Sequence, residues 1–205
     1  MLKDIKLYEF LDELASPSAA PGGGSASALL CSTAASLVCM VCHLTIGKKG
    51  YEESEHELKR VLEEAEVLRK KAEGLIDGDT NAFKEVIAAY KIPEEDAKRS
   101  IIIQNALKNA TATPLEVARI GVRILELAKI VAFRGNVNSV SDAGGAALAA
   151  GAGLYGAIFN VKINLKSMND ETFKGSTKIE LNALEERGKI LLEEVNGIVS
   201  FKLSN

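Results

Sequence analysis

The sequence predicts an all-α protein, because helical periodicity runs through nearly the whole chain and no segment alternates in the manner of a strand. At 205 residues the chain is long enough for one sizeable core. No repeat, low-complexity segment or Gly/Pro-rich linker divides it. We therefore expect a single-domain bundle over residues 1–205, with about seven to eight helices, two of them buried and rich in small residues.

The first half of the chain predicts three helices. An amphipathic helix spans residues 2–14, where Leu2, Phe10 and Leu14 share a face. A buried, uncharged helix starts at Ser25. From about Glu52 a long apolar stripe continues to residue 90.

Two prolines mark predicted helix boundaries in the second part of the chain. Pro93 ends the stripe and opens a helix to about residue 109. The segment Thr113-Pro114-Leu115-Glu116 has the pattern of a capping box with proline in the first turn, which predicts a new helix to about Val131. A loop over residues 133–139, the second buried helix and a last amphipathic helix from about Ser176 to Phe201 follow.

Composition narrows the class of protein. Apolar residues make up 47% and charged residues 26%, which is typical of a folded globular chain. A net charge of −3 argues against a general nucleic-acid binder, and the absence of a signal-like leader favours the cytoplasm. The uncharged runs 25–47 and 143–161 are long enough to span a membrane. They consist of Ala, Ser and Gly without an aromatic belt, so we expect buried core helices and no membrane partner.

The segment from Ser16 to Ser25 is the most informative stretch. Pro21 stiffens the chain before Gly22, Gly23 and Gly24, which let a backbone approach a ligand without a Cβ in the way. A helix begins at once, so its free N–H groups would face the loop and form a site for an anion or a polar ligand. The alternative is a flexible leader before an ordinary helix start.

Asp77 and Asp79 point to different faces of one helix, because residues two apart do not share a face. The periodicity of the apolar stripe puts Asp79 on the buried face and Asp77 on the wet face. A buried carboxyl is suited to acid–base chemistry near neutral pH. The alternative is that Asp79 caps a new helix after a break at Gly78.

Amide and hydroxyl side chains, together with one carboxylate, gather in the last third of the chain. Their number exceeds what one helix cap explains, and amides suit the donor and acceptor edge of a heterocycle, although polar contacts between helices are the alternative. The group consists of Asn136, Asn138, Ser141, Asp142, Asn160 and Asn164. Lys48 and Lys49 end the first buried helix, where they either complement the helix dipole or form a cationic mouth for a carboxylate.

The three cysteines Cys31, Cys39 and Cys42 lie on one predicted helix. Cys39 to His43 matches the spacing of a haem-attachment motif, but it falls inside a continuous apolar helix, which argues against attachment. With His56 as the only other histidine, a zinc site does not close, so we expect no metal. The role of the cysteines stays open.

With these residues in view, the chain resembles the formiminotetrahydrofolate cyclodeaminase/cyclohydrolase family over nearly its whole length. The likeness rests on the order of several motifs. These are residues 18–25, Thr45 to Lys49, Asp79 with Ala82-Phe83, Gly135-Asn136 with Asn138 and Ser141-Asp142, and Phe159-Asn160-Val161 with Ile163-Asn164.

The resemblance implies a folate site formed by Pro21 to Ser25 and the asparagines, with Asp79 as the catalytic carboxylate and Asp77 as a nearby alternative. Lys48 and Lys49 would meet the glutamate tail of a folate, which is polyglutamylated in some forms. No cofactor beyond the tetrahydrofolate substrate is expected, and the family suggests a homodimer. The cysteine-rich stretch departs from the small residues usual in the family.

The implied reaction is cyclisation of 5-formiminotetrahydrofolate to 5,10-methenyltetrahydrofolate with release of ammonia. The alternatives are a methenyltetrahydrofolate cyclohydrolase and a non-catalytic folate-binding or structural helical dimer. The sequence does not decide between the two reactions.

Overall fold

The computed structural model describes residues 1–204, and every regular element within them is helical. Three one-turn 3-10 helices, η1 (Leu2–Asp4), η2 (Glu52–Ser54) and η3 (Val137–Ser139), join the longer elements. The α-helices are α1 (Leu7–Ala15), α2 (Gly23–His43), α3 (Glu55–Tyr90), α4 (Arg99–Arg134), α5 (Val140–Lys166) and α6 (Glu171–Ser204).

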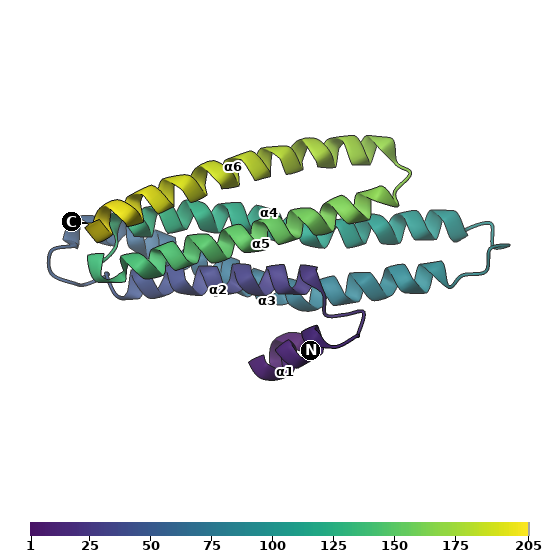
Figure 1. The fold of residues 1–205 in the computed structure, drawn as a ribbon, viewed down its shortest axis with the longest axis horizontal. Helices are drawn as coiled ribbons and strands as arrows, with labels where there is room; N and C mark the ends of the chain where they lie inside the picture. The colour runs from purple at the N-terminus through teal and green to yellow at the C-terminus, as the bar shows by residue number, and fades with distance from the viewer. Residues whose placement is uncertain (205) are drawn as a thin grey trace.

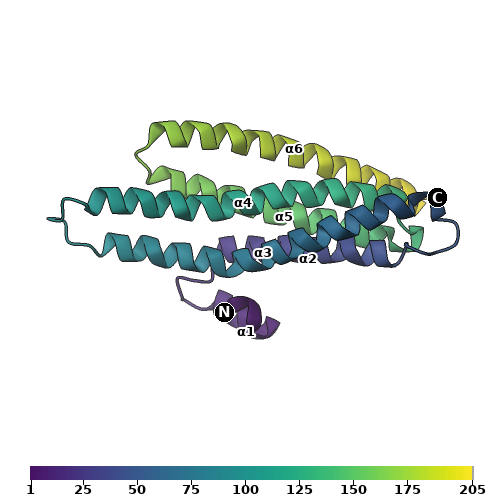
Figure 2. The same ribbon diagram turned by 180° about the vertical axis from the view of Figure 1, so that it is seen from behind.

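Helices α2, α3, α4 and α5 form an antiparallel bundle in which each helix contacts its neighbours (Figure 1). Helix α6 packs outside this bundle against α4 and α5, as the view from behind also shows (Figure 2). The short helix α1 lies beside the bundle rather than within it (Figure 1). Because α3 and α4 are much longer than α2, they extend well past its first residue (Figure 1).

The all-α bundle is confirmed, but residues 1–204 contain six α-helices rather than seven to eight. The main error concerns Pro114, which lies inside the continuous helix α4 instead of starting a new one. The predicted helix over residues 2–14 is also broken, because Ile5 is extended between η1 and α1.

The two small-residue helices α2 and α5 pack against each other at close range. A Cβ at Gly153 of α5 would lie 2.6 Å from Cys31 Sγ and 2.9 Å from the carbonyl oxygen of Ser27 on α2. Only glycine permits this separation of the two helices. Both helices are long and apolar enough to cross a membrane, yet 61% and 50% of their most apolar windows are buried within the bundle.

Candidate functional site

A cavity of about 390 Å³ opens where α2 begins. Helices α3, α4 and α5 continue past the start of α2, so only these three helices of the bundle surround the space there. The cavity is lined by Ala19, Ala20, Gly22, Gly23, Gly24, Asp79, Phe83, Val86, Tyr90, Leu107, Ala110, Asn160, Ile163, Asn164 and Ser167. The first turn of α2 therefore faces one carboxyl group and two amides across an otherwise apolar space.

Asp79 is half-buried at the wall of this cavity. Its Oδ2 accepts a hydrogen bond from the backbone N–H of Ser25 at 2.9 Å and lies 3.1 Å from Ser25 Oγ. Among residues 1–204 no protein group donates to Oδ1, and this oxygen is not sealed from the cavity. One oxygen is thus held by the protein while the other is available to a ligand.

Burial raises the pKa of the Asp79 carboxyl above its usual range, and the hydrogen bonds from the Ser25 side chain and backbone oppose this rise. Ser25 itself is fully buried. Its hydroxyl lies 2.9 Å from the carbonyl oxygen of Ile76, one turn before Asp79. Ser25 therefore fixes both the position and the acidity of the carboxyl.

The glycines give α2 its close approach to this carboxyl. A Cβ at Gly24 would lie 2.7 Å from Asp79 Oδ2 and closer still to the rest of the carboxylate, so any larger residue would displace it. A Cβ at Gly23 would lie 3.3 Å from Asn160 Nδ2. Gly22 has no neighbour within 4 Å of such a Cβ, and it lines the cavity as the N-cap residue of α2. Pro21 is buried just outside the cavity lining.

Asn160 and Asn164 lie one turn apart on α5, and both face the cavity. Asn160 Nδ2 donates to the carbonyl oxygen of Gly156 at 2.8 Å, and Asn164 Nδ2 donates to that of Ala110 at 2.9 Å. Each amide uses its nitrogen on the protein, which leaves its oxygen free to accept from a ligand.

The partner of Asn164 explains the proline within α4. Pro114 has no N–H, so it cannot make the helical hydrogen bond to the carbonyl of Ala110 four residues earlier. Asn164 Nδ2 donates to that same carbonyl. The proline thus provides an acceptor at the cavity wall that orients an amide of the next helix.

Asp77 does not lie on the wet face as expected, because it is only 8% exposed. The 3-10 helix η1 folds over it, and the backbone N–H of Leu2 donates to Asp77 Oδ1 at 2.6 Å. The alternative reading of Asp79, a helix cap after a break at Gly78, is wrong, since α3 runs unbroken from Glu55 to Tyr90. Asp77 anchors the N-terminal segment, and Asp79 alone of the two lines the cavity.

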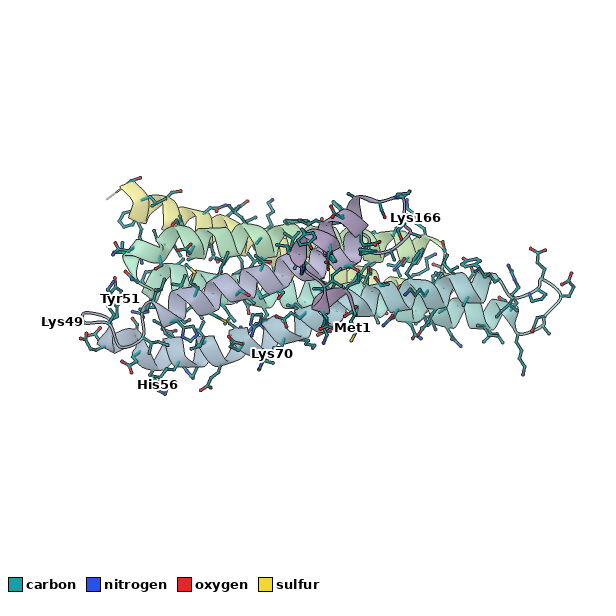
Figure 3. The ribbon with its side chains drawn as sticks, turned by 90° about the horizontal axis from the view of Figure 1, so that it is seen from below. Met1, Lys49, Tyr51, His56, Lys70 and Lys166 are labelled. Atoms are coloured by element: carbon teal, nitrogen blue, oxygen red, sulfur yellow. The ribbon has the colours of Figure 1, made fainter. Side chains whose placement is uncertain are left out.

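The other predicted residues lie at the opposite end of α2 within this chain. Figure 3 shows Lys49 and Tyr51 at one end of the bundle, far from Lys166 near the cavity end of α5. Lys48 and Lys49 are exposed in the loop after α2. Asn138, Ser141 and Asp142 lie around η3 and the start of α5.

Asn136 has a structural role at that end. Its backbone N–H donates to Thr45 Oγ1 at 2.9 Å, and its Nδ2 donates to the carbonyl oxygen of Leu44 at 3.1 Å. Its Oδ1 accepts from the N–H of Asn138 at the start of η3. Within one chain, the fold therefore brings Gly22–Ser25 together with Asp79, Asn160 and Asn164. The Asn136 group, which consists of Asn136, Asn138, Ser141 and Asp142, lies apart from them.

The sequence analysis missed the apolar walls of the cavity. Phe83, Val86 and Tyr90 of α3 belonged to the predicted stripe, and periodicity did not show that they extend beyond α2. No group of three or more potential ligands for a metal ion occurs in residues 1–204. Burial raises the pKa of Cys31 and Cys42 to about 12, so these thiols act as core residues.

Comparison with known proteins agrees with this geometry. The model of the formiminotransferase-cyclodeaminase family matches residues 6–183. The chain belongs to this family. It is thus an enzyme of the folate cyclodeaminase/cyclohydrolase class.

Relatives in this family carry two different activities in their names. Methenyltetrahydrofolate cyclohydrolase of Methylorubrum extorquens is 45% identical over 95% of this chain and 96% of its own length. The crystal structure of formiminotetrahydrofolate cyclodeaminase from Thermotoga maritima matches with a TM-score of 0.92 at 33% identity, covering 99% of this chain and all of that one. Formimidoyltransferase-cyclodeaminase of Rattus norvegicus is 33% identical over 92% of this chain, which spans only 36% of that longer protein.

The close approach of α2 to α3 predicts that Gly24→Ala lowers kcat/KM, because the added methyl group displaces the Asp79 carboxyl. A shift of about 1 Å in such a group costs on the order of 10²-fold in rate. Gly74→Ala is the matched control on α3, where a Cβ meets nothing within 4 Å. Steady-state kinetics of both folded variants test this, and equal activity would contradict the role of Gly24.

The link between Pro114 and Asn164 predicts that Pro114→Ala raises KM several-fold while it stabilises α4. An alanine supplies the missing N–H to the Ala110 carbonyl and removes a helix-breaking residue worth about 3 kcal/mol in an ideal helix. Asn164→Ala should raise KM in the same direction. A more stable Pro114→Ala variant with an unchanged KM would show that the proline does not orient Asn164.

Proposed function

We propose that the chain acts on the one-carbon unit between N5 and N10 of tetrahydrofolate, with hydrolysis of the 5,10-methenyl bridge as its main reaction. The 45% identity to a cyclohydrolase over nearly all of both chains favours this reaction. The observation that carries the chemistry is Asp79, a single partly desolvated carboxyl with one oxygen held by Ser25 and one facing the cavity.

In hydrolysis, a water molecule adds to the electrophilic methenyl carbon. Asp79 Oδ1 accepts a proton from this water as the carbon–oxygen bond forms, which gives a tetrahedral carbon attached to both nitrogens. The protonated carboxyl then returns the proton to N5 as the carbon–N5 bond breaks, and the hydroxyl on the same carbon loses its remaining proton to solvent water, which leaves a neutral formyl group on N10. General acid–base catalysis of this kind contributes on the order of 10² to 10⁴ in rate.

Cyclisation of 5-formiminotetrahydrofolate is the second candidate, favoured by the TM-score of 0.92 to the Thermotoga maritima cyclodeaminase. Here N10 attacks the carbon of the protonated formimino group and gives its own proton to Asp79. The same carboxyl then protonates the leaving nitrogen, which departs as ammonia. Both reactions pass through a tetrahedral carbon between the same two nitrogens, so one pocket suits both.

The remaining cavity residues suit a pterin ring. The free amide oxygens of Asn160 and Asn164 would accept from ring N–H and amino groups, and the apolar side chains of Phe83, Val86 and Tyr90 would cover its faces. Both reactions are an addition and an elimination at one carbon, with proton transfers at oxygen or nitrogen, so the proposal requires a tetrahydrofolate derivative and, for hydrolysis, water. The cytoplasm stays the predicted location.

We also propose a homodimer through the outer face of α2 and α5, whose exposed apolar side chains are Leu30, Met40, Leu44, Leu148, Phe159 and Ile163. The pocket and the Asn136 group lie at opposite ends of this face. A two-fold axis crossing the helices would bring one chain's pocket to the partner's Asn136 group. Light scattering should give twice the chain mass of 21.9 kDa, and Leu148→Glu should shift it toward the monomer. A monomeric mass for the unmodified chain would contradict the dimer.

The role of Asp79 predicts that Asp79→Asn binds folate but loses turnover by at least about 10²-fold, because an amide cannot accept the proton. Decay of the methenyl absorbance measures hydrolysis. Growth of the same absorbance with ammonia release measures cyclisation of 5-formiminotetrahydrofolate. The variant should also melt at a higher temperature at neutral pH, since the raised folded pKa means that an ionised Asp79 weakens the fold as pH rises.

The assays separate the candidates. Activity with only one of the two substrates assigns the reaction. The value of kcat/KM should fall as the pH is lowered through the raised pKa of Asp79, because the protonated carboxyl cannot act as a base. Folate binding without either activity would leave the non-catalytic folate-binding protein. An active Asp79→Asn variant would remove this carboxyl from the mechanism.

A further inference from the structure

The Ser25 hydroxyl has more acceptors within reach than it has protons. Its Oγ lies 2.9 Å from the carbonyl oxygen of Ile76 and 3.1 Å from Asp79 Oδ2. A serine carries a single O–H proton, so it donates fully to one of these two oxygens at a time. The hydroxyl therefore has two alternative orientations beside the carboxyl of the candidate site.

The Ile76 carbonyl does not depend on the Ser25 proton. It lies four residues before Thr80 in the unbroken helix α3, so the backbone N–H of Thr80 is its regular helical donor. The carbonyl thus stays paired when the Ser25 hydroxyl turns away from it. Turning toward Asp79 leaves no unpaired acceptor behind.

The side chain of Thr80 holds the other side of the Ser25 hydroxyl. Thr80 is only 8% exposed, and its Oγ1 lies 3.3 Å from Ser25 Oγ, which is its one hydrogen-bond partner among residues 1–204. If Ser25 donated to Thr80, the Thr80 proton would have no acceptor among these residues, and a buried donor without an acceptor is costly. Donation from Thr80 to Ser25 uses both protons, so the geometry favours this direction.

The lining of the cavity brings no second charge to Asp79. Within this lining Asp79 is the only charged side chain and Tyr90 the only other titratable one, since α4 and α5 contribute apolar and uncharged polar residues. On α3, Asp77 lies under η1 and Lys84 lines a neighbouring cavity. Helix α2 contains no acidic or basic residue apart from its last one. The hydrogen bonds from Ser25 are therefore the main local influence that opposes the effect of burial on this carboxyl.

We propose, on the basis of the proposed function, that Thr80 is a positioning residue. By donating to Ser25 Oγ, it directs the Ser25 proton to Asp79 Oδ2 while the carboxylate is ionised, and to the Ile76 carbonyl once Oδ1 has taken a proton. A hydrogen bond to a charged carboxylate is stronger than one to a neutral oxygen, so protonation of Oδ1 makes the nearer Ile76 carbonyl the better acceptor. The Ser25 proton stays on its own oxygen throughout, and only its direction changes.

Removal of the Thr80 hydroxyl tests this role. Thr80→Val keeps the shape of the side chain but leaves Ser25 Oγ without its donor, which weakens the Ser25 bond to the ionised carboxylate. The pKa of Asp79 and the acid limb of kcat/KM should then both rise by about 0.3 pH unit. Thr80→Ser restores the hydroxyl and should restore both values. Thr111→Val is the matched control and should shift neither, because Thr111 is buried in α4 and its hydroxyl donates to the Leu107 carbonyl of the same helix.

Two independent readouts keep this test separate from that of the reaction. Carboxyl NMR gives the midpoint of Asp79 without substrate, and steady-state kinetics with the folate substrate give the acid limb, which reports the same free enzyme. Because Thr80 acts through Ser25, Thr80→Val should add no shift in a Ser25→Ala background.

An unchanged midpoint or acid limb in Thr80→Val, an equal shift in Thr111→Val, or a further shift in the Ser25→Ala background would overturn the role of Thr80 while the folate reaction stood. A midpoint that rises in Thr80→Val and returns in Thr80→Ser, in a protein inactive in both folate assays, would confirm the hydrogen-bond arrangement and refute the proposed function.

Discussion

The contact between the first turn of α2 and the Asp79 carboxyl on α3 constrains the rest of the candidate site. The carboxylate occupies the space that a Cβ at Gly24 would need, and its Oδ2 is fixed by the N–H of Ser25. This contact sets the separation of α2 and α3 where the cavity opens. It also removes water from one side of the carboxyl, so the geometry of packing and the raised pKa have the same origin.

The exposure of the other polar groups to the cavity depends on where α2 begins. Helix α2 begins late, so α3, α4 and α5 present inward-facing residues to an open space rather than to a fourth helix. Asn164 would be costly in a closed core, and here it donates to the Ala110 carbonyl that Pro114 leaves without its helical partner. The carbonyl of Ala110 in α4, which lacks its helical donor, thus orients the side chain of Asn164 in α5.

Periodicity predicted the helical class, the two buried small-residue helices and the inward position of Asp79, because these follow from local spacing. It failed for Asp77, since the segment that covers it lies 75 residues away in sequence. It also failed at Pro114, where the local pattern of a helix start was outweighed by tertiary contacts along α4. Spacing could not show that Asn136 and Asn160 lie at opposite ends of the bundle, because that depends on the antiparallel path of α5 beside α2.

The central claim is that Asp79 is a desolvated carboxyl poised to exchange a proton with a ligand in the cavity. Carbon-detected NMR of the aspartate carboxyl groups, assigned by comparison with Asp79→Asn, measures this directly. We expect the Asp79 resonance to titrate above the ordinary range for aspartate, and at still higher pH in Ser25→Ala, because Ser25 lowers the pKa. A midpoint at or below the ordinary value, unchanged in Ser25→Ala, would contradict the account.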